Sequence, residues 1–224
     1  MKNIEELYTD DYFNSRISND VKRLRSFEYE WDLMKNYVDN TGVVCDVGCS
    51  TGEFLQEIKW KGKLYGMEVN QEAINIAESN GVLFDKNILT EKNFFDVVVF
   101  RGTIQHVSDP FGYIALAYEA LKPGGKIFFL ATPNANSICY KIFNTLPMLD
   151  SKLNFYIPSD VTLTNILDMF NFSVIKVEFP YRISPYSSYI TDHLGFLKSI
   201  IFQKPGKYAF WKNMMNVVAV KPKL

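Results

Sequence analysis

The chain has 224 residues, a formal net charge of -1, 47% hydrophobic residues and 22% charged residues. These values fit one globular domain, and they exclude a disordered chain and a surface built wholly for nucleic acid. Its three cysteines are too few for a disulfide framework, and no Cys/His spacing resembles a metal site. The start of the chain lacks an apolar leader core, and no stretch approaches the roughly 18 apolar residues that span a bilayer. We therefore expect a single cytoplasmic domain over residues 1–224 that needs no metal.

Apolar, β-branched runs alternate with amphipathic stretches along the chain, the pattern of βαβ units around a mostly parallel sheet. The runs predict strands at 43–47, 64–69, 82–84, 95–100, 126–131, 174–179 and 216–220. The amphipathic stretches predict helices at 51–59, 71–79, 109–121 and 160–170. Asn70 is a good helix N-cap, Pro110 suits a first turn, and the Pro-Gly-Gly at 123–125 predicts a turn after the third helix.

Three segments do not fit this alternation. Residues 1–40 predict a helical cap that precedes the core, and the core itself covers residues 41–132. Residues 133–159 and 181–212 are long connections, where α/β cores usually have short ones. Loops of that length commonly carry binding residues, so both are expected to be insertions on the substrate side.

A glycine-rich turn joins the first strand to the first helix of the core. The strand ends in Asp46, the turn carries Gly48 and Gly52, and the second strand ends in Glu68 about 20 residues on. Glycines let the backbone approach a ligand, and a carboxylate at that strand end can accept both ribose hydroxyls. The turn reads D-x-G-x-x-x-G, and its acid disfavours the pyrophosphate of NAD but suits an ammonium group. A strand-to-helix turn without a ligand is the alternative.

Four segments in order resemble class I S-adenosylmethionine-dependent methyltransferases of the small-molecule type, typified by ubiquinone-biosynthesis and surface-polysaccharide enzymes. The segments are D-V-G-C-S-T-G-E-F, G-M-E-V-N, F-F-D-V-V-V-F-R-G-T-I-Q-H-V-S-D-P and A-L-K-P-G-G-K-I. The resemblance is close over about residues 40–133 and weak to about residue 179. It implies a Rossmann-like α/β fold with seven strands, the last antiparallel, and S-adenosylmethionine as cofactor.

The resemblance also implies roles by position. Asp46 and the backbone of Gly48 would hold the methionine ammonium group, and Glu68 would bind the ribose hydroxyls. Asn87 stands where the family usually has an aspartate that contacts the adenine, and Ser50 stands where it usually has glycine. Further residues expected in the cofactor site are Cys49 and Gly52 in the turn, Val69 and Ile88 beside the adenine, Arg101 through its backbone, and Tyr12 in an N-terminal lid.

Methyl transfer to a hydroxyl requires alignment of the acceptor and removal of a proton. His106 follows the fourth predicted strand, at the edge where open α/β sheets bind ligands, and is the candidate catalytic base. It could instead cap the helix that begins near Asp109, or line the cofactor pocket. His193 lies in the second insertion, either as a substrate contact or as a surface histidine.

From Tyr181 onwards the chain carries seven basic residues, one acid and many aromatic residues. This mixture suits an anionic small-molecule acceptor such as a phosphorylated or nucleotide-linked sugar. A membrane contact at 193–202, a solvated basic face and a homodimer interface are alternatives. Nucleic acid is disfavoured as a substrate because the chain lacks overall positive charge. An O-methyltransferase is the leading hypothesis. A cofactor-binding protein without catalysis, serving assembly or regulation, comes second, and an NAD enzyme third.

Overall fold

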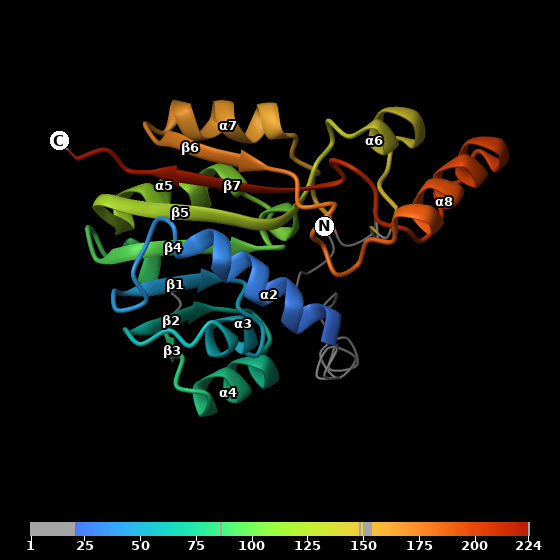
Figure 1. Ribbon diagram of the computed structural model, residues 1–224. Helices are drawn as coiled ribbons and strands as arrows, with labels where there is room; N and C mark the ends of the chain where they lie inside the picture. The colour runs from blue at the N-terminus through green and yellow to red at the C-terminus, as the bar shows by residue number, and fades with distance from the viewer. Residues whose placement is uncertain (1–20, 86, 148, 150–153, 224) are drawn as a thin grey trace.

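The computed structural model describes residues 21–85, 87–147, 149 and 154–223. They form a seven-stranded sheet in the order β3-β2-β1-β4-β5-β7-β6, as Figure 1 shows. The strands are β1 (Val44–Val47), β2 (Leu64–Met67), β3 (Leu83–Phe84), β4 (Phe95–Arg101), β5 (Leu121–Pro133), β6 (Ser173–Glu178) and β7 (Met214–Val220). The first five are parallel, and β7 runs antiparallel between β5 and β6. The Rossmann-like sheet with an antiparallel last strand is therefore confirmed.

Helices cover both faces of the sheet (Figure 1). They are α2 (Val21–Met34), α3 (Glu53–Glu57), α4 (Gln71–Ser79), α5 (Pro110–Ala120), α6 (Ile138–Phe143), α7 (Asp160–Met169) and α8 (Tyr189–Phe202), with short 3-10 turns η2 (Ile88–Thr90) and η3 (Ile104–His106). One buried cluster joins β4 and β5 to α5 and α7, and a second joins the same strands to α2, α3 and α4. Successive residues of β5 point to opposite faces of the sheet, so that Phe128 packs in the second cluster and Phe129 in the first.

Several predicted boundaries were wrong, including the end of the second strand, which is Met67 and not residue 69. Two of the differences have a clear physical cause. The helix after the glycine-rich turn begins at Glu53, because Gly52 has a φ of 74° and takes the cap position. Strand β5 begins at Leu121, although the Pro-Gly-Gly that follows was expected to form a turn outside it. Leu121 pairs with Phe95, and regular pairing with β4 resumes at Lys126 after a shift in register. Sheet pairing thus extends the strand across residues that favour turns on their own.

The two insertions each contain a helix that lies off the sheet. Helices α6 and α8 sit beyond the end of the sheet towards which the parallel strands point (Figure 1). They share a small third cluster, in which Cys139, Leu146 and Tyr208 are buried and Phe196 and Phe210 pack against them. The edge of the sheet where the carboxyl ends of β1 and β4 lie is therefore flanked by inserted structure.

Candidate active site

The turn after β1 is held against the end of β2 by backbone hydrogen bonds. The N–H groups of Gly48 and Cys49 donate to the Met67 carbonyl at 2.7 and 3.1 Å. Gly48 has a φ of 77°, and a Cβ atom there would lie 2.4 Å from Cγ2 of Thr103. The turn therefore requires glycine at this position both for its backbone conformation and for its close approach to the segment after β4.

Glu68 is fixed by the turn that it faces. Its Oε2 accepts the N–H of Ser50 at 3.0 Å, and its Oε1 accepts the N–H groups of Val69 and Asn70 at 2.7 and 3.2 Å. Ser50 itself has a φ of 52°, in the left-handed region that favours glycine. The contacts place a carboxylate beside the glycine-rich turn, as expected for a group that binds ribose hydroxyls.

Asp46 is a buried carboxylate, with 1% of its surface exposed. No described residue donates a hydrogen bond to its Oδ1 atom. Burial raises the pKa of Asp46 to about 7, the Arg101 guanidinium opposes that shift, and the Glu68 and Glu30 carboxylates add to it. A buried acceptor with an unused oxygen favours a cationic donor, and the ammonium group of a methionine moiety is such a donor.

Arg101, at the end of β4, directs its side chain towards α2. Its Nε donates to Glu30 Oε2 at 2.5 Å, one terminal nitrogen donates to the Ser26 hydroxyl at 3.2 Å, and its guanidinium lies 4.3 Å from the centre of the Phe27 ring. Glu30 is buried, and burial raises its pKa while Arg101 lowers it. The resemblance implied a role for the Arg101 backbone, and the side chain adds a link between the sheet and α2.

Sequence reasoning missed the residues of α2 that meet Arg101. Phe27, Glu30 and Met34 are three and four residues apart, and all three are buried on one side of the helix. An acid within an otherwise apolar stripe was the signal that could have found this contact, because a buried carboxylate needs a partner.

His106 ends η3, directly after the turn that follows β4. Its backbone N–H donates to the Thr103 carbonyl at 2.7 Å, and its Nε2 lies 3.1 Å from the side-chain nitrogen of Gln105. Asp109 caps α5 instead, because its Oδ1 accepts the N–H of Gly112 at 2.8 Å. The half-buried imidazole thus lies at the same sheet edge as the glycine-rich turn.

The segment at 154–157 lies against the His106 turn. The N–H of Phe155 donates to the Gln105 carbonyl at 2.9 Å. The next residue, Tyr156, has a buried hydroxyl to which no described residue bonds, and burial raises its pKa to about 12. Tyr156 was not predicted as a site residue, although its place in the first insertion is the signal that could have found it.

The remaining predicted residues are distributed around the turn. Gly52 has a φ of 74°, Val69 is half exposed, Ile88 is buried, and Asn87 is exposed at the start of η2. Burial raises the pKa of Cys49 above its ordinary range, which keeps the thiol protonated. His193 packs in α8 between Tyr189 and Phe210. Tyr12 lies outside the described residues.

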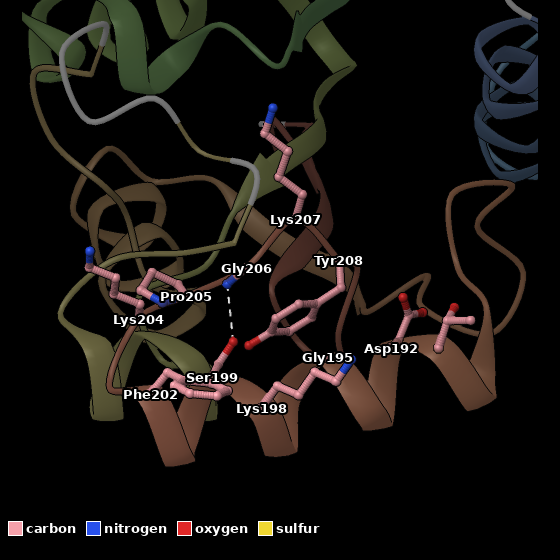
Figure 2. Close-up of a pocket in the computed structure, with 11 residues that line it drawn as sticks. Asp192, Gly195, Lys198, Ser199, Phe202, Lys204, Pro205, Gly206, Lys207 and Tyr208 are labelled. Carbon is pink, nitrogen blue, oxygen red and sulfur yellow. Dashed lines mark hydrogen bonds between the residues drawn. The ribbon is translucent and has the colours of Figure 1, made fainter.

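Two hollows lie on the inserted side of the molecule. A groove of about 350 Å³ runs between α8 and the segment at 204–208, and Figure 2 shows the residues that line it. A pocket of about 260 Å³ lies where the start of β7 meets the insertions. Its lining is largely apolar and includes Leu146, Leu149, Pro180, Tyr181, Tyr186, Phe210 and Met214. Met214 pairs with Pro133 at the carboxyl end of β5, so this pocket opens at the same sheet edge as the turn.

Among the described residues, no cluster of three or more His, Cys, Asp or Glu side chains could hold a metal ion. Cys45, Cys49 and Cys139 are buried free thiols. No helix within the described ranges is long and apolar enough to cross a membrane.

Comparison with known proteins agrees with this geometry. Residues 20–177 match the model of a methyltransferase domain family, and the chain belongs to that family. The fold and the turn define the class as class I S-adenosylmethionine-dependent methyltransferases, and S-adenosylmethionine is the cofactor. The buried Oδ1 of Asp46 and the left-handed Gly48 and Gly52 fit such a cofactor.

Individual relatives share 30% identity or less with this chain over the regions compared. A ubiquinone biosynthesis O-methyltransferase of a Shewanella strain is 30% identical over an alignment of 122 positions, which covers 46% of this chain and 51% of the relative. The chain thus spans about half the length of the curated relatives that it matches. A SAM-dependent methyltransferase of Thermotoga maritima has 20% identity and a TM-score of 0.65, with coverage of 99% and 100%. A Haemonchus contortus phosphoethanolamine N-methyltransferase bound to S-adenosylhomocysteine has 17% identity and a TM-score of 0.64, with coverage of 99% and 61%.

Proposed function

We propose that this chain transfers a methyl group from S-adenosylmethionine to a hydroxyl of a small acceptor, with His106 as the base. The single observation that carries the proposal is the position of His106 at the sheet edge shared with Asp46 and the glycine-rich turn. An imidazole has an ordinary pKa near 6.5, so its neutral form is available to accept a proton at physiological pH.

The cofactor would be held by residues around the turn. Asp46 would accept hydrogen bonds from the ammonium group through its buried Oδ1, and Gly48 would let the backbone approach the methionine moiety. Glu68 would accept the ribose hydroxyls while it keeps its bonds to the turn. Val69, Ile88 and Asn87 would surround the adenine, with Cys49, Ser50 and Gly52 shaping the turn and the Arg101 backbone beside the sulfur.

The bound cofactor supplies a methyl group on a positively charged sulfur. The methyl group would pass to the acceptor oxygen, and the neutral sulfur would leave with the electron pair of the carbon–sulfur bond. His106 takes the hydroxyl proton in the same step. Tyr156 follows Phe155, whose backbone bonds to the His106 turn, and its buried hydroxyl would donate a hydrogen bond that orients the acceptor. The work left to the chain is alignment and proton removal.

The acceptor class follows from the inserted side of the molecule. The pocket of about 260 Å³ suits an apolar portion, and the lysines of the second insertion suit a phosphate. A hydroxylated metabolite or a sugar or glycan precursor linked to phosphate combines these features. The Shewanella relative is named for ubiquinone biosynthesis, which supports O-methylation. We also propose that the enzyme works in the cytoplasm and without a metal. A homodimer is to be tested by direct measurement.

The test has two stages, which separate cofactor binding from chemistry. Calorimetric titration with S-adenosylhomocysteine, with NADH as control, should show binding of the first compound alone. Release of S-adenosylhomocysteine is then followed with a panel of catechols, nucleotide sugars and polyprenyl-phosphate sugars. His106→Gln should bind the cofactor normally and lose at least 100-fold in kcat, because a general base contributes a rate factor of about 10²–10⁴. His193→Gln is the matched control and should keep its turnover.

Either of two results would overturn the proposal. Full turnover by His106→Gln would remove the base from the mechanism. Binding of S-adenosylhomocysteine by a chain that turns over no acceptor on the panel would favour the second candidate, a cofactor-binding protein that acts without catalysis.

A further inference from the structure

Helix α8 carries a continuous aliphatic stripe on its outer face. The stripe consists of Ile190, Leu194, Leu197 and Ile201, at intervals of four, three and four residues, so all four lie along one side of the helix. Their side chains are 72%, 53%, 55% and 73% exposed. Aliphatic residues this exposed and this continuous on one helix face commonly mark an interaction surface.

The inner face of α8 is firmly packed, which holds the stripe outward. Phe196 stacks on Phe210 with ring centres 4.3 Å apart, and a Cβ atom on Gly195 would lie 2.9 Å from the Tyr208 ring. The buried hydroxyl of Ser199 accepts the N–H of Gly206 at 3.0 Å (Figure 2). The helix is thus fixed to the third cluster by its opposite side, and it stands clear of the sheet (Figure 1).

The charge beside the stripe is positive. Lys198 follows Leu197 on α8, and Lys204 lies just beyond the end of the helix; both line the groove of about 350 Å³ (Figure 2). Lys207 also lines the groove, but its side chain points away from α8 (Figure 2). The one acid of the helix, Asp192, is 3% exposed, and its Oδ2 accepts the Tyr181 hydroxyl at 3.0 Å and the Ser188 N–H at 2.6 Å. The exposed surface of α8 therefore presents an aliphatic face and one cation, Lys198, and its one acid is buried.

We propose that α8 docks on the surface of an anionic lipid bilayer, with the stripe among the upper acyl chains and Lys198 and Lys204 at the headgroups. Interfacial helices combine these two features, an apolar face and basic residues beside it. The helix has 14 residues and a length of about 21 Å, which is too short to span a bilayer of about 30 Å, so it lies in the plane of the surface. A second copy of the chain is the less favourable occupant, because pairing of two stripes would bring like-charged lysines together.

Docking in this way also orients the candidate active site. Helix α8 lies beyond the end of the sheet towards which the parallel strands point (Figure 1). The apolar pocket that contains Tyr208 and Phe210 opens beside the same helix. An acceptor with an apolar portion would therefore reach the pocket from the lipid surface. The docking inference itself does not depend on the identity of the acceptor or on the role of His106.

Vesicle flotation of the full chain tests the proposal. We expect at least tenfold stronger binding to phosphatidylcholine vesicles with about one third phosphatidylglycerol than to phosphatidylcholine alone. Leu197→Asp/Ile201→Asp should lose at least 90% of that binding, because two aliphatic side chains would no longer bury their apolar surface in the bilayer. Lys198→Glu/Lys204→Glu should lose the preference for the anionic lipid. Met169→Asp and Lys176→Glu, exposed residues of α7 and β6, are the matched controls and should bind as the unchanged chain does.

Three results would overturn the proposal. The first is no binding to either vesicle, and the second is binding that the stripe variant leaves unchanged. The third is a dimer in light scattering that Leu197→Asp/Ile201→Asp converts to a monomer, which would assign the stripe to a second copy. Titration with S-adenosylhomocysteine shows in each case that the variant is folded, and failure of methyl transfer alone leaves this inference standing.

Discussion

The carboxylate of Glu68 accepts the backbone N–H of Ser50 at 3.0 Å, from the end of β2 to the middle of the glycine-rich turn. The same carboxylate accepts two N–H groups from the residues that follow it. Its position is therefore set before a ligand arrives, which is the arrangement that lowers the ordering cost of binding. The acid and the glycines form one unit, although 18 residues separate Glu68 from Ser50.

Glu68→Gln tests this unit. The amide keeps one acceptor oxygen but loses the charge and the second acceptor. We expect S-adenosylhomocysteine to bind roughly tenfold to hundredfold more weakly, since hydrogen bonds to charged groups contribute about 1.5–3 kcal/mol. Calorimetric titration measures the change. Glu78→Gln, an exposed acid in α4, should bind as the unchanged chain does, and equal affinities for the two variants would refute the assignment.

If Asp46 holds the ammonium group as proposed, cofactor binding should depend on pH. Burial raises the pKa of Asp46 to about 7 in the cofactor-free protein. The cationic ammonium group favours the ionised carboxylate, so affinity should be full above that pKa and fall about tenfold per pH unit below it. Titration with S-adenosylhomocysteine between roughly pH 5.5 and 8.5 gives the profile. Asp46→Asn should bind weakly with a flat profile, and a flat profile in the unchanged chain would contradict the role.

Arg101 and Glu30 should be coupled in stability. Arg101→Met leaves the Glu30 carboxylate buried without its cation, so we expect the free energy of unfolding to fall by about 3–5 kcal/mol. Arg101→Met/Glu30→Met should lose much less than the sum of the single variants, and urea unfolding measures the cycle. Lys35→Met removes an exposed pair with Asp32 and should cost about 0–1 kcal/mol. Additive losses for Arg101 and Glu30 would disprove the coupling.

Gly48 combines a left-handed backbone with a close contact to Thr103. Gly81 is a control, because it has a left-handed backbone without such a contact. Gly81 has a φ of 80° and no heavy atom within 4 Å of a built Cβ, whereas Gly48 meets Thr103. Gly81→Ala should cost about 1–2 kcal/mol of stability and leave cofactor affinity unchanged. Gly48→Ala should cost a further 1–3 kcal/mol or so and weaken S-adenosylhomocysteine binding, as expected of overpacking. Thr103→Ala should partly restore both, and no restoration would remove the contact as the cause.

The sheet and the meeting of Asp46, the glycine-rich turn and Glu68 at one edge could be predicted from the sequence because their signals are local. Asp46 lies in the first of two strands that are visible as apolar runs, Gly48 and Glu68 directly follow those strands, and the ends of parallel strands meet at one edge. The contact between Arg101 and Glu30 joins residues 71 positions apart, so it depends on where α2 lies on the sheet. No local pattern encodes that placement.

On the inserted side, too, the local pattern could be predicted from the sequence and the packing between distant residues could not. The basic and aromatic residues after Tyr181 were visible in the sequence, and a membrane contact was among the alternatives. That the aliphatic residues of α8 face outward depends on packing of Phe196 and Gly195 against residues of the following segment. The start of β5 at Leu121 likewise reflects sheet pairing with Phe95, which outweighs the turn preference of the Pro-Gly-Gly.

The order of strands in the sheet constrains how the chain can fold as it is synthesised. Within the part of the chain that the structure describes, β6 pairs with β7 alone, and β7 pairs with both β5 and β6. A ribosome makes β6 first, so this strand has no hydrogen-bonding neighbour until residues 214–220 have left the exit tunnel. The first five strands can assemble on the nascent chain, since each of β2 to β5 finds a partner among strands already made. The outer edge of the sheet must wait, and the nascent chain carries β6 as an exposed strand during that interval.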